Sequence, residues 1–129
     1  MLNLSHKKLD LYQVALKLVK EIYQQTKGFP DSEKFGLTSQ LRRASISVCS
    51  NIAEGSSRIS LQEKKRFFEM SRSSAVEIDS QLEISLTLEY LKREAIKELE
   101  NYMERTFMML CKLIEQLNKR IEETNSKNQ

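Results

Sequence analysis

Residues that interrupt helices are almost absent from this sequence, whose 129 residues include only three glycines and one proline. Leu, Glu, Lys, Ile, Ser and Arg dominate instead, and this composition favours long helices over sheets. The length corresponds to one domain, in which folding buries roughly two thirds of the surface that the unfolded chain exposes. The sequence therefore predicts a single all-α domain over residues 1–129.

Apolar residues recur at spacings of three and four in four segments, which predicts four amphipathic helices. We place them at about 8–26, 32–55, 61–90 and 92–121, followed by a flexible polar tail over 122–129. Gly55 is interpreted as a C-terminal cap, and Ser60 with Glu63 has the spacing of a capping box. Phe67, Phe68 and Phe107 are expected in the core. Because short links join antiparallel neighbours, the pattern predicts an antiparallel up-and-down four-helix bundle.

The predicted second helix carries a column of hydrogen-bonding side chains beside its core stripe. The column consists of Gln40, Arg43, Ser47, Asn51 and Glu54. One interpretation is a solvated face whose ion pairs each contribute under about 1 kcal/mol. The other is a buried network in which Asn51 and Glu54 meet Arg66 or Arg72 and fix the register between subunits.

Apolar residues also occur on the outward faces of the second and third helices. They are Ile46, Cys49 and Ala53 on the second helix and Met70, Ile84 and Leu88 on the third. Single exposed apolar residues are normal, but repeated ones favour contacts between subunits. The set expected in a polar network or a subunit contact is Gln40, Ile46, Ser47, Cys49, Asn51, Ala53, Glu54, Met70 and Glu77.

Charge is distributed unevenly along the chain. Residues 34–72 hold eight basic and three acidic residues (8 − 3 = +5), and residues 77–104 hold three basic and eight acidic residues (3 − 8 = −5). A basic surface can neutralise phosphates and release counterions. The candidates for nucleic-acid binding are Arg42, Arg43, Arg58, Lys64, Lys65, Arg66 and Arg72. Without exposed aromatic residues among them, binding would be directed at the backbone.

Groups for catalysis or metal binding are not evident. His6 is the only histidine, the cysteines Cys49 and Cys111 have no neighbouring metal-ligand residue, and no glycine-rich phosphate loop occurs. We therefore expect no enzymatic activity, catalytic residue, cofactor or metal. Without a signal segment or an apolar run of about 20 residues, a soluble cytoplasmic protein with reduced thiols is expected.

A family resemblance begins at Gln40-Leu41-Arg42-Arg43-Ala44 and continues through Asn51-Ile52-Ala53-Glu54-Gly55 to Arg66-Phe67-Phe68. The chain resembles the 23S ribosomal RNA intervening-sequence proteins, which are bacterial four-helix bundles. This family is similar to the accessory variability proteins of diversity-generating retroelements, pentameric barrels that bind nucleic acid and a reverse transcriptase. The resemblance implies a homopentamer. The chain departs from the family at Ser73, where glycine is usual, and at Ser71, where alanine is common.

Two functions remain open at this level. The first is a homopentameric module whose arginines bind RNA or DNA phosphates. The second is a protein-interaction scaffold in which the same arginines pair with Glu54, Glu69 and Glu77 and leave little free positive surface. In both cases the protein would assemble with itself, and a membrane partner is not expected.

Overall fold

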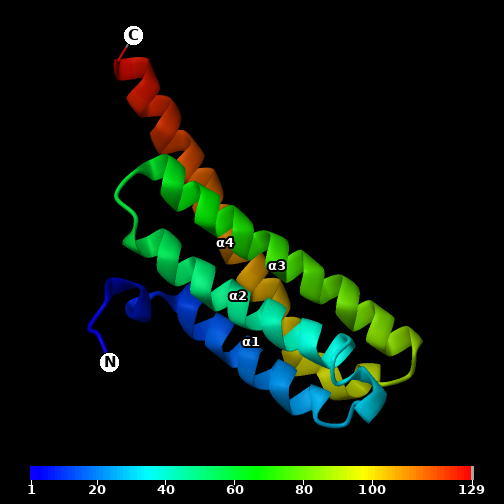
Figure 1. The fold of residues 1–129 in the computed structure, drawn as a ribbon. Helices are drawn as coiled ribbons and strands as arrows, with labels where there is room; N and C mark the ends of the chain where they lie inside the picture. Colours follow the sequence, from blue (N-terminus) through cyan, green and yellow to red (C-terminus); the bar gives the residue numbers. More distant parts are fainter. Residues whose placement is uncertain (129) are drawn as a thin grey trace.

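The structure, a computed structural model, describes residues 1–128 and consists of four long α-helices in sequence (Figure 1). They are α1 (Asp10–Thr26), α2 (Leu37–Ser57), α3 (Leu61–Thr87) and α4 (Lys97–Lys127). Three short 3-10 helices accompany them: η1 (Ser5–Lys8), η2 (Asp31–Glu33) and η3 (Arg93–Ile96). No strand occurs in the described part of the chain, and the predicted all-α class is confirmed.

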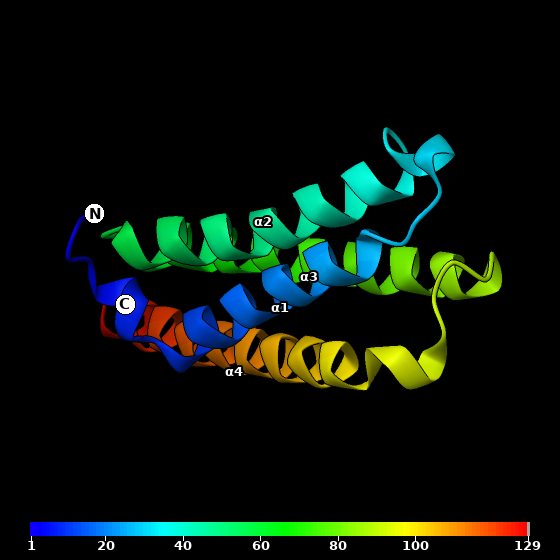
Figure 2. The ribbon, with the colours of Figure 1, turned by 90° about the horizontal axis from the view of Figure 1, so that it is seen from below.

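The four helices pack around one apolar core. Each of α1 and α3 packs against both α2 and α4, and the two views show α1 and α3 on opposite sides of the bundle (Figure 2). The apolar stripes of all four helices meet in the middle, where the largest fully buried apolar side chains are Leu18, Ile22, Leu41, Ile52, Ile78, Ile96, Leu99 and Leu110. This placement leaves the charged side chains on the outside.

The start of α2 lies later than predicted, at Leu37 rather than about residue 32. The Glu33 carboxylate accepts a hydrogen bond from the backbone N–H of Leu37 at 3.2 Å and another from the Tyr90 hydroxyl at 3.0 Å. The Tyr90 bond and the nearby negative charge raise the pKa of Tyr90. Glu33 therefore caps α2 from a separate 3-10 turn, a role that helical periodicity does not reveal.

Three further helix ends differ from the predicted ones, namely the end of α3, the start of α4, which was predicted at about residue 92, and the end of α4. α3 ends at Thr87 rather than about residue 90, and Glu89 adopts φ 65°, a left-handed conformation that cannot continue a helix. α4 begins at Lys97 and continues to Lys127, beyond the predicted end at residue 121. Most of the predicted flexible tail is thus helical. Its last residue, 129, lies outside the described residues.

Gly55 is not the C-terminal cap of α2, because the helix continues to Ser57. A Cβ atom at Gly55 would lie 3.0 Å from Cε1 and 3.1 Å from Cζ of Phe68, and 3.2 Å from Cβ of Phe67. The glycine is needed for the close approach of α3 rather than for a turn.

Two of the three phenylalanines expected in the core lie at its edge. Phe68 is buried, but Phe67 is half-buried and Phe107 is 39% exposed. None of the helices in the described residues has a stretch long and apolar enough to cross a membrane.

Candidate nucleic-acid interface

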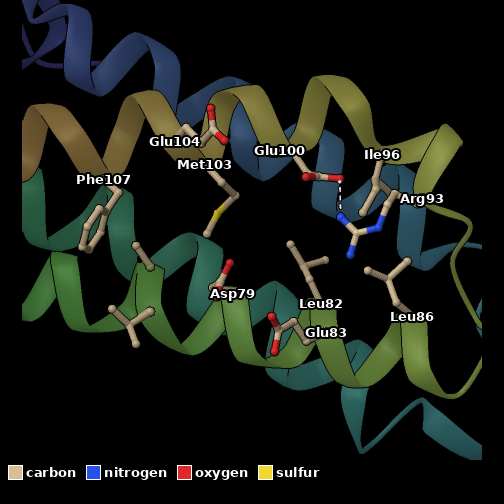
Figure 3. A pocket seen from close by; sticks show the side chains of 12 residues that line it. Asp79, Leu82, Glu83, Leu86, Arg93, Ile96, Glu100, Met103, Glu104 and Phe107 are labelled. Carbon is tan, nitrogen blue, oxygen red and sulfur yellow. Dashed lines mark ion pairs between the residues drawn. The ribbon is translucent and has the colours of Figure 1, made fainter.

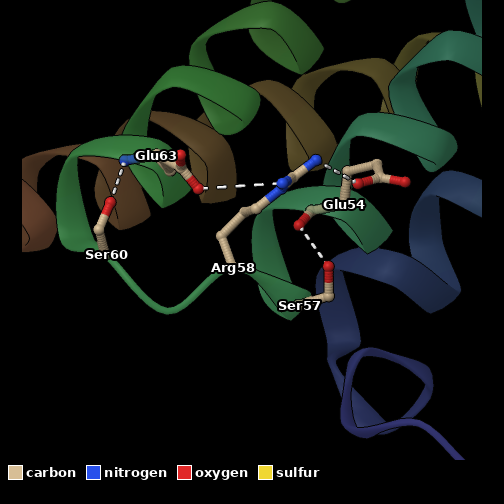
Figure 4. A network of polar contacts seen from close by, with 5 residues as sticks. All are labelled: Glu54, Ser57, Arg58, Ser60 and Glu63. Atoms are coloured by element: carbon tan, nitrogen blue, oxygen red, sulfur yellow. Dashed lines mark hydrogen bonds and ion pairs between the residues drawn. The ribbon is translucent and has the colours of Figure 1, made fainter.

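Arg58 is held in the link between α2 and α3 by neighbours from both helices (Figure 4). Its guanidinium lies 3.1 Å from the Glu54 carboxylate and 3.9 Å from that of Glu63, and 4.7 Å from the centroid of the Phe67 ring. The Ser60 hydroxyl accepts a hydrogen bond from the backbone N–H of Glu63 at 3.0 Å, which confirms the Ser60 half of the predicted capping box. The Glu63 carboxylate faces Arg58 instead of reaching back to Ser60. Arg58 therefore uses its charge to connect two helices.

Arg42 is turned toward the end of α1. Its Nε donates to the Thr26 hydroxyl at 2.9 Å and a terminal nitrogen donates to the carbonyl of Tyr23 at 3.5 Å. The guanidinium also lies 4.6 Å from the centroid of the Tyr23 ring. A cation at this position adds a hydrogen bond to a carbonyl in the last turn of α1 and interacts favourably with the helix dipole.

Two more of the predicted basic residues contact the protein itself. Lys64 donates to the backbone carbonyl of Ser56 at 3.1 Å, and Arg72 lies 3.9 Å from the sulfur of Cys111, a weak contact. Four of the seven candidates thus have an ion pair or a hydrogen bond within the chain, and a fifth, Arg66, lies 5.9 Å from the centroid of the Phe67 ring. In three of these four cases the partner is a carbonyl, a hydroxyl or a sulfur rather than a carboxylate.

Arg43, Lys65 and Arg66 form no ion pair with any of the described residues. Arg43 is exposed and lies with Gln40, Ser47 and Glu77 around a polar pocket of about 510 Å³ between α2 and α3. Arg66 precedes Glu77 by eleven residues, which places both on nearly the same face of α3. Eleven residues correspond to about 16 Å along α3, and Arg43 lies beside Glu77 at the polar pocket. Arg43 and Arg66 therefore belong to one face of the α2–α3 pair and are about 16 Å apart along the helix axis.

Lys65 belongs to a different face. It precedes Glu83 by eighteen residues, or five full helical turns, so both point in the same direction from α3. Glu83 lines a groove between α3 and α4. The three unpaired cations therefore do not form one patch, and only Arg43 and Arg66 share a surface.

The polar column of α2 mostly forms a seam with α3. Gln40 accepts a bond from Gln81 at 3.3 Å, and the hydroxyls of Ser47 and Ser74 are 2.9 Å apart. The Asn51 amide donates to both the carbonyl and the hydroxyl of Ser47 at 3.0 Å.

The partners predicted for this network are wrong in part. Among the described residues Asn51 and Glu54 do not meet Arg66 or Arg72, because Asn51 bonds within its own helix and Glu54 pairs with Arg58. The seam residues join two helices of one chain, and the exposed Glu77 lies at its edge.

The outward apolar residues are placed correctly with one exception. Ile46 is 44% exposed, Met70 is 42% exposed and Ala53 is half-buried. Cys49, predicted to face outward, is buried. It follows Arg42, which contacts α1, by two helical turns, so it lies on the side of α2 that faces α1. Burial raises the pKa of the Cys49 thiol to about 11, so the thiol stays protonated near neutral pH.

Groups able to form a metal site were not found among residues 1–128, where no cluster of three or more His, Cys, Asp or Glu side chains occurs. His6 is buried, and its ring stacks edge-on against that of Tyr12 at 4.7 Å between centroids. The imidazole thus has a packing partner at the N-terminal end of the bundle.

An all-α fold of four long helices, with its unpaired cations on the surface of α2 and α3, defines a helical bundle protein. The chain belongs to the family of 23S rRNA-intervening sequence proteins, whose family model matches residues 7–112. A similar solved structure is the crystal structure of a protein of unknown function from the S23 ribosomal protein family of Bacteroides thetaiotaomicron. The two sequences are 22% identical, and the match covers 81% of this chain and 95% of the other chain with a TM-score of 0.74. No curated protein matches the sequence.

Proposed function

We propose that this protein is a non-enzymatic, cytoplasmic module that binds RNA or DNA phosphates through Arg43 and Arg66. The observation that supports this best is that both arginines lie on one face of α2 and α3 and have no ion pair with the described residues. The family name, which refers to a sequence within ribosomal RNA, agrees with a nucleic-acid partner. Arg58 lies in the link between these helices, but its charge is balanced by Glu54 and Glu63, so the proposal rests on Arg43 and Arg66 alone.

The spacing of the two arginines suits a phosphate backbone. About 16 Å along the helix axis corresponds to about five steps of 3.4 Å along one strand of a duplex. Exposed guanidinium groups bind phosphates without reading the bases, so we expect affinity without strong sequence preference. Each phosphate neutralised contributes about −0.9 to the slope of log K against log salt for duplex DNA.

The test is a fluorescence-anisotropy titration with labelled RNA and DNA at several salt concentrations. Arg43→Glu with Arg66→Glu should lower the affinity at least tenfold and make the salt slope shallower. The matched control is Lys97→Glu with Lys112→Glu, which makes the same change of charge on exposed positions of α4. Equal binding by the arginine variant and the control would refute the proposal.

We also propose that the protein self-associates, with five subunits as the number that the family resemblance implies. The exposure of Ile46 and Met70 supports subunit contacts. Multi-angle light scattering of the purified protein measures the assembly directly. A monomer mass at micromolar concentration would contradict this part of the proposal.

The pairing of Arg58 with Glu54 favours a second candidate, a protein-interaction scaffold with structural arginines. Against it, Glu69 and Glu77 do not pair with any of the seven basic residues in the described part of the chain. Under this alternative the protein would not bind RNA or DNA even at low salt, and the titration above separates the two functions.

A further inference from the structure

A groove of about 450 Å³ runs between α3 and α4 (Figure 3). Its floor is apolar and includes Leu82, Leu86, Ile96 and Met103, while Phe107 extends the apolar lining toward one end. The phenylalanine is 39% exposed although it is one of the largest apolar side chains of α4. A partly exposed apolar strip of this kind is typical of an interaction surface.

Carboxylates line both edges of this groove. Asp79 and Glu83 are four residues apart on α3, and Glu100 and Glu104 are four residues apart on α4. Because residues four apart project from the same side of a helix, each pair forms a short acidic row beside the apolar strip. Arg93 is the only cation in the lining and lies 3.6 Å from Glu100, so the net charge of the rim is 1 − 4 = −3. The groove thus has the chemistry to accept a helix with an apolar stripe and flanking cations.

The outward stripe of α1 has this complementary chemistry. Leu9, just before the helix, and Leu16 are 39% and 41% exposed and are separated by two helical turns. Lys20 and Lys27 continue the same line after Leu16, and Lys17 lies on one flank of it together with Asp10. All three lysines are exposed and have no ion pair with the described residues. Residues at helical spacing along this stripe therefore offer two leucines, three lysines and the carboxylate of Asp10, a net charge of 3 − 1 = +2.

We propose that the α3–α4 groove of one copy receives the outward stripe of α1 from a second copy. This inference rests on the proposed self-association and names its two surfaces. The leucines of α1 fill the apolar strip, and its lysines lie against the acidic rows. The exposed face of α2 fits the groove less well, because the exposed Ser50 and Ser57 accompany Ile46 there and their side chains are too small to fill it.

The positions of the two surfaces determine the kind of assembly. The groove lies between α3 and α4, whereas α1 is on the opposite side of the bundle from α3 (Figure 2). A copy that accepts the neighbouring α1 in its groove still has its own α1 free. The contact is therefore heterologous, and repetition forms a closed ring or an open filament rather than a two-fold dimer.

The experiment exchanges the charges of the two surfaces. One variant carries Lys17→Glu and Lys20→Glu, a second carries Asp79→Lys and Glu83→Lys, and a third combines all four substitutions. Light scattering and sedimentation velocity over a range of concentrations measure the assembly. A matched control carries Lys34→Glu and Lys127→Glu, exposed lysines outside both surfaces. Circular dichroism establishes that each variant keeps the helical content of the parent protein.

We expect each two-site variant to raise the apparent dissociation constant at least about tenfold, because like charges then face each other across the contact. The four-site variant should recover most of the parent affinity, and the control should match the parent protein. Should a two-site variant lose helical content, Lys20→Glu and Glu83→Lys alone, and then together, give the same comparison.

Three outcomes would overturn the inference. An oligomer unaffected by either charge exchange would leave self-association intact but assign it to other surfaces, and would leave the groove to a different cationic partner. Dissociation of both folded variants without recovery in the combination would show that the two surfaces do not meet. A monomeric parent protein would refute the self-association proposal together with this contact.

Discussion

Replacement of Gly55 by alanine should destabilise the bundle, although the same change normally stabilises a helix. Glycine inside a helix costs roughly 1 kcal/mol relative to alanine. At Gly55, however, the new Cβ would lie 3.0 to 3.2 Å from Phe68 and Phe67 across the α2–α3 contact. Overpacking of a core costs about 1 to 3 kcal/mol, and we expect the upper part of this range because the Cβ atom approaches two side chains and the ring of Phe68 is buried. The net loss of unfolding free energy should be about 1 to 2 kcal/mol.

Urea and thermal unfolding followed by circular dichroism at one fixed protein concentration measure this loss. For a chain of this length it corresponds to a fall in Tm of about 4 to 8 °C. Gly28→Ala is the matched control, since no atom lies within 4 Å of its Cβ position and its φ is not positive. The control should stabilise the protein by about 0.4 to 1 kcal/mol through the unfolded state.

The steric explanation also predicts coupling between Gly55 and Phe68. Phe68→Leu replaces the ring by a smaller side chain. The loss of unfolding free energy that it causes should be about 1 kcal/mol smaller in the Gly55→Ala background than in the parent protein. A Gly55→Ala variant that is more stable than the parent, or purely additive effects of the two substitutions, would refute the reasoning.

Three further predictions test the local contacts. Arg42→Ala should lower the unfolding free energy by about 1 to 2 kcal/mol because it removes the contacts with Thr26 and Tyr23, while Arg43→Ala should stay within about 0.5 kcal/mol; equal losses in denaturant melts would contradict the assigned role of Arg42. Ser60→Ala should cost about 1 kcal/mol through loss of the N-cap, and Ser60→Asp should retain most of the stability; a neutral Ser60→Ala would show that the cap contributes little. Burial raises the pKa of the Cys49 thiol from 9.0 to about 11 in the folded state, so the unfolded chain loses this proton at lower pH than the folded protein does. The stabilisation that comes from keeping the thiol protonated is therefore fully present below pH 9 and is lost as the pH rises through 11. Stability measured from pH 8 to 11 should therefore fall more steeply in the parent protein than in Cys49→Ala, and parallel curves would contradict this.

The helical class and most of the core follow from the sequence because helical periodicity depends on local spacing alone. Cys49 shows where that reasoning stops. A helix in a bundle has two neighbours, and both of its flanks can be covered. The side of α2 that holds Cys49 is covered by α1, whereas the side that holds Ser47 and Asn51 is covered by α3. A single apolar stripe does not indicate how wide the buried arc is.

The partners of the basic residues were beyond sequence reasoning for a different physical reason. Arg42 and Lys64 bond to the backbone carbonyls of Tyr23 and Ser56, and every residue has such an oxygen. Which carbonyl is within reach depends on where helices end and how they cross. A sum of charges along the chain therefore overestimated the free positive surface, while the local pair Arg58 and Glu54, at four-residue spacing, was open to prediction.

The connection formed by Arg58, Glu54 and Glu63 has a consequence for the order in which the bundle folds. It closes the link between α2 and α3 with contacts between residues less than ten positions apart in sequence. Local contacts form early because little chain entropy is lost in closing them. We expect α2 and α3 to associate before α1 and α4 dock, so substitutions at this link should slow refolding while those on α1 mainly speed unfolding.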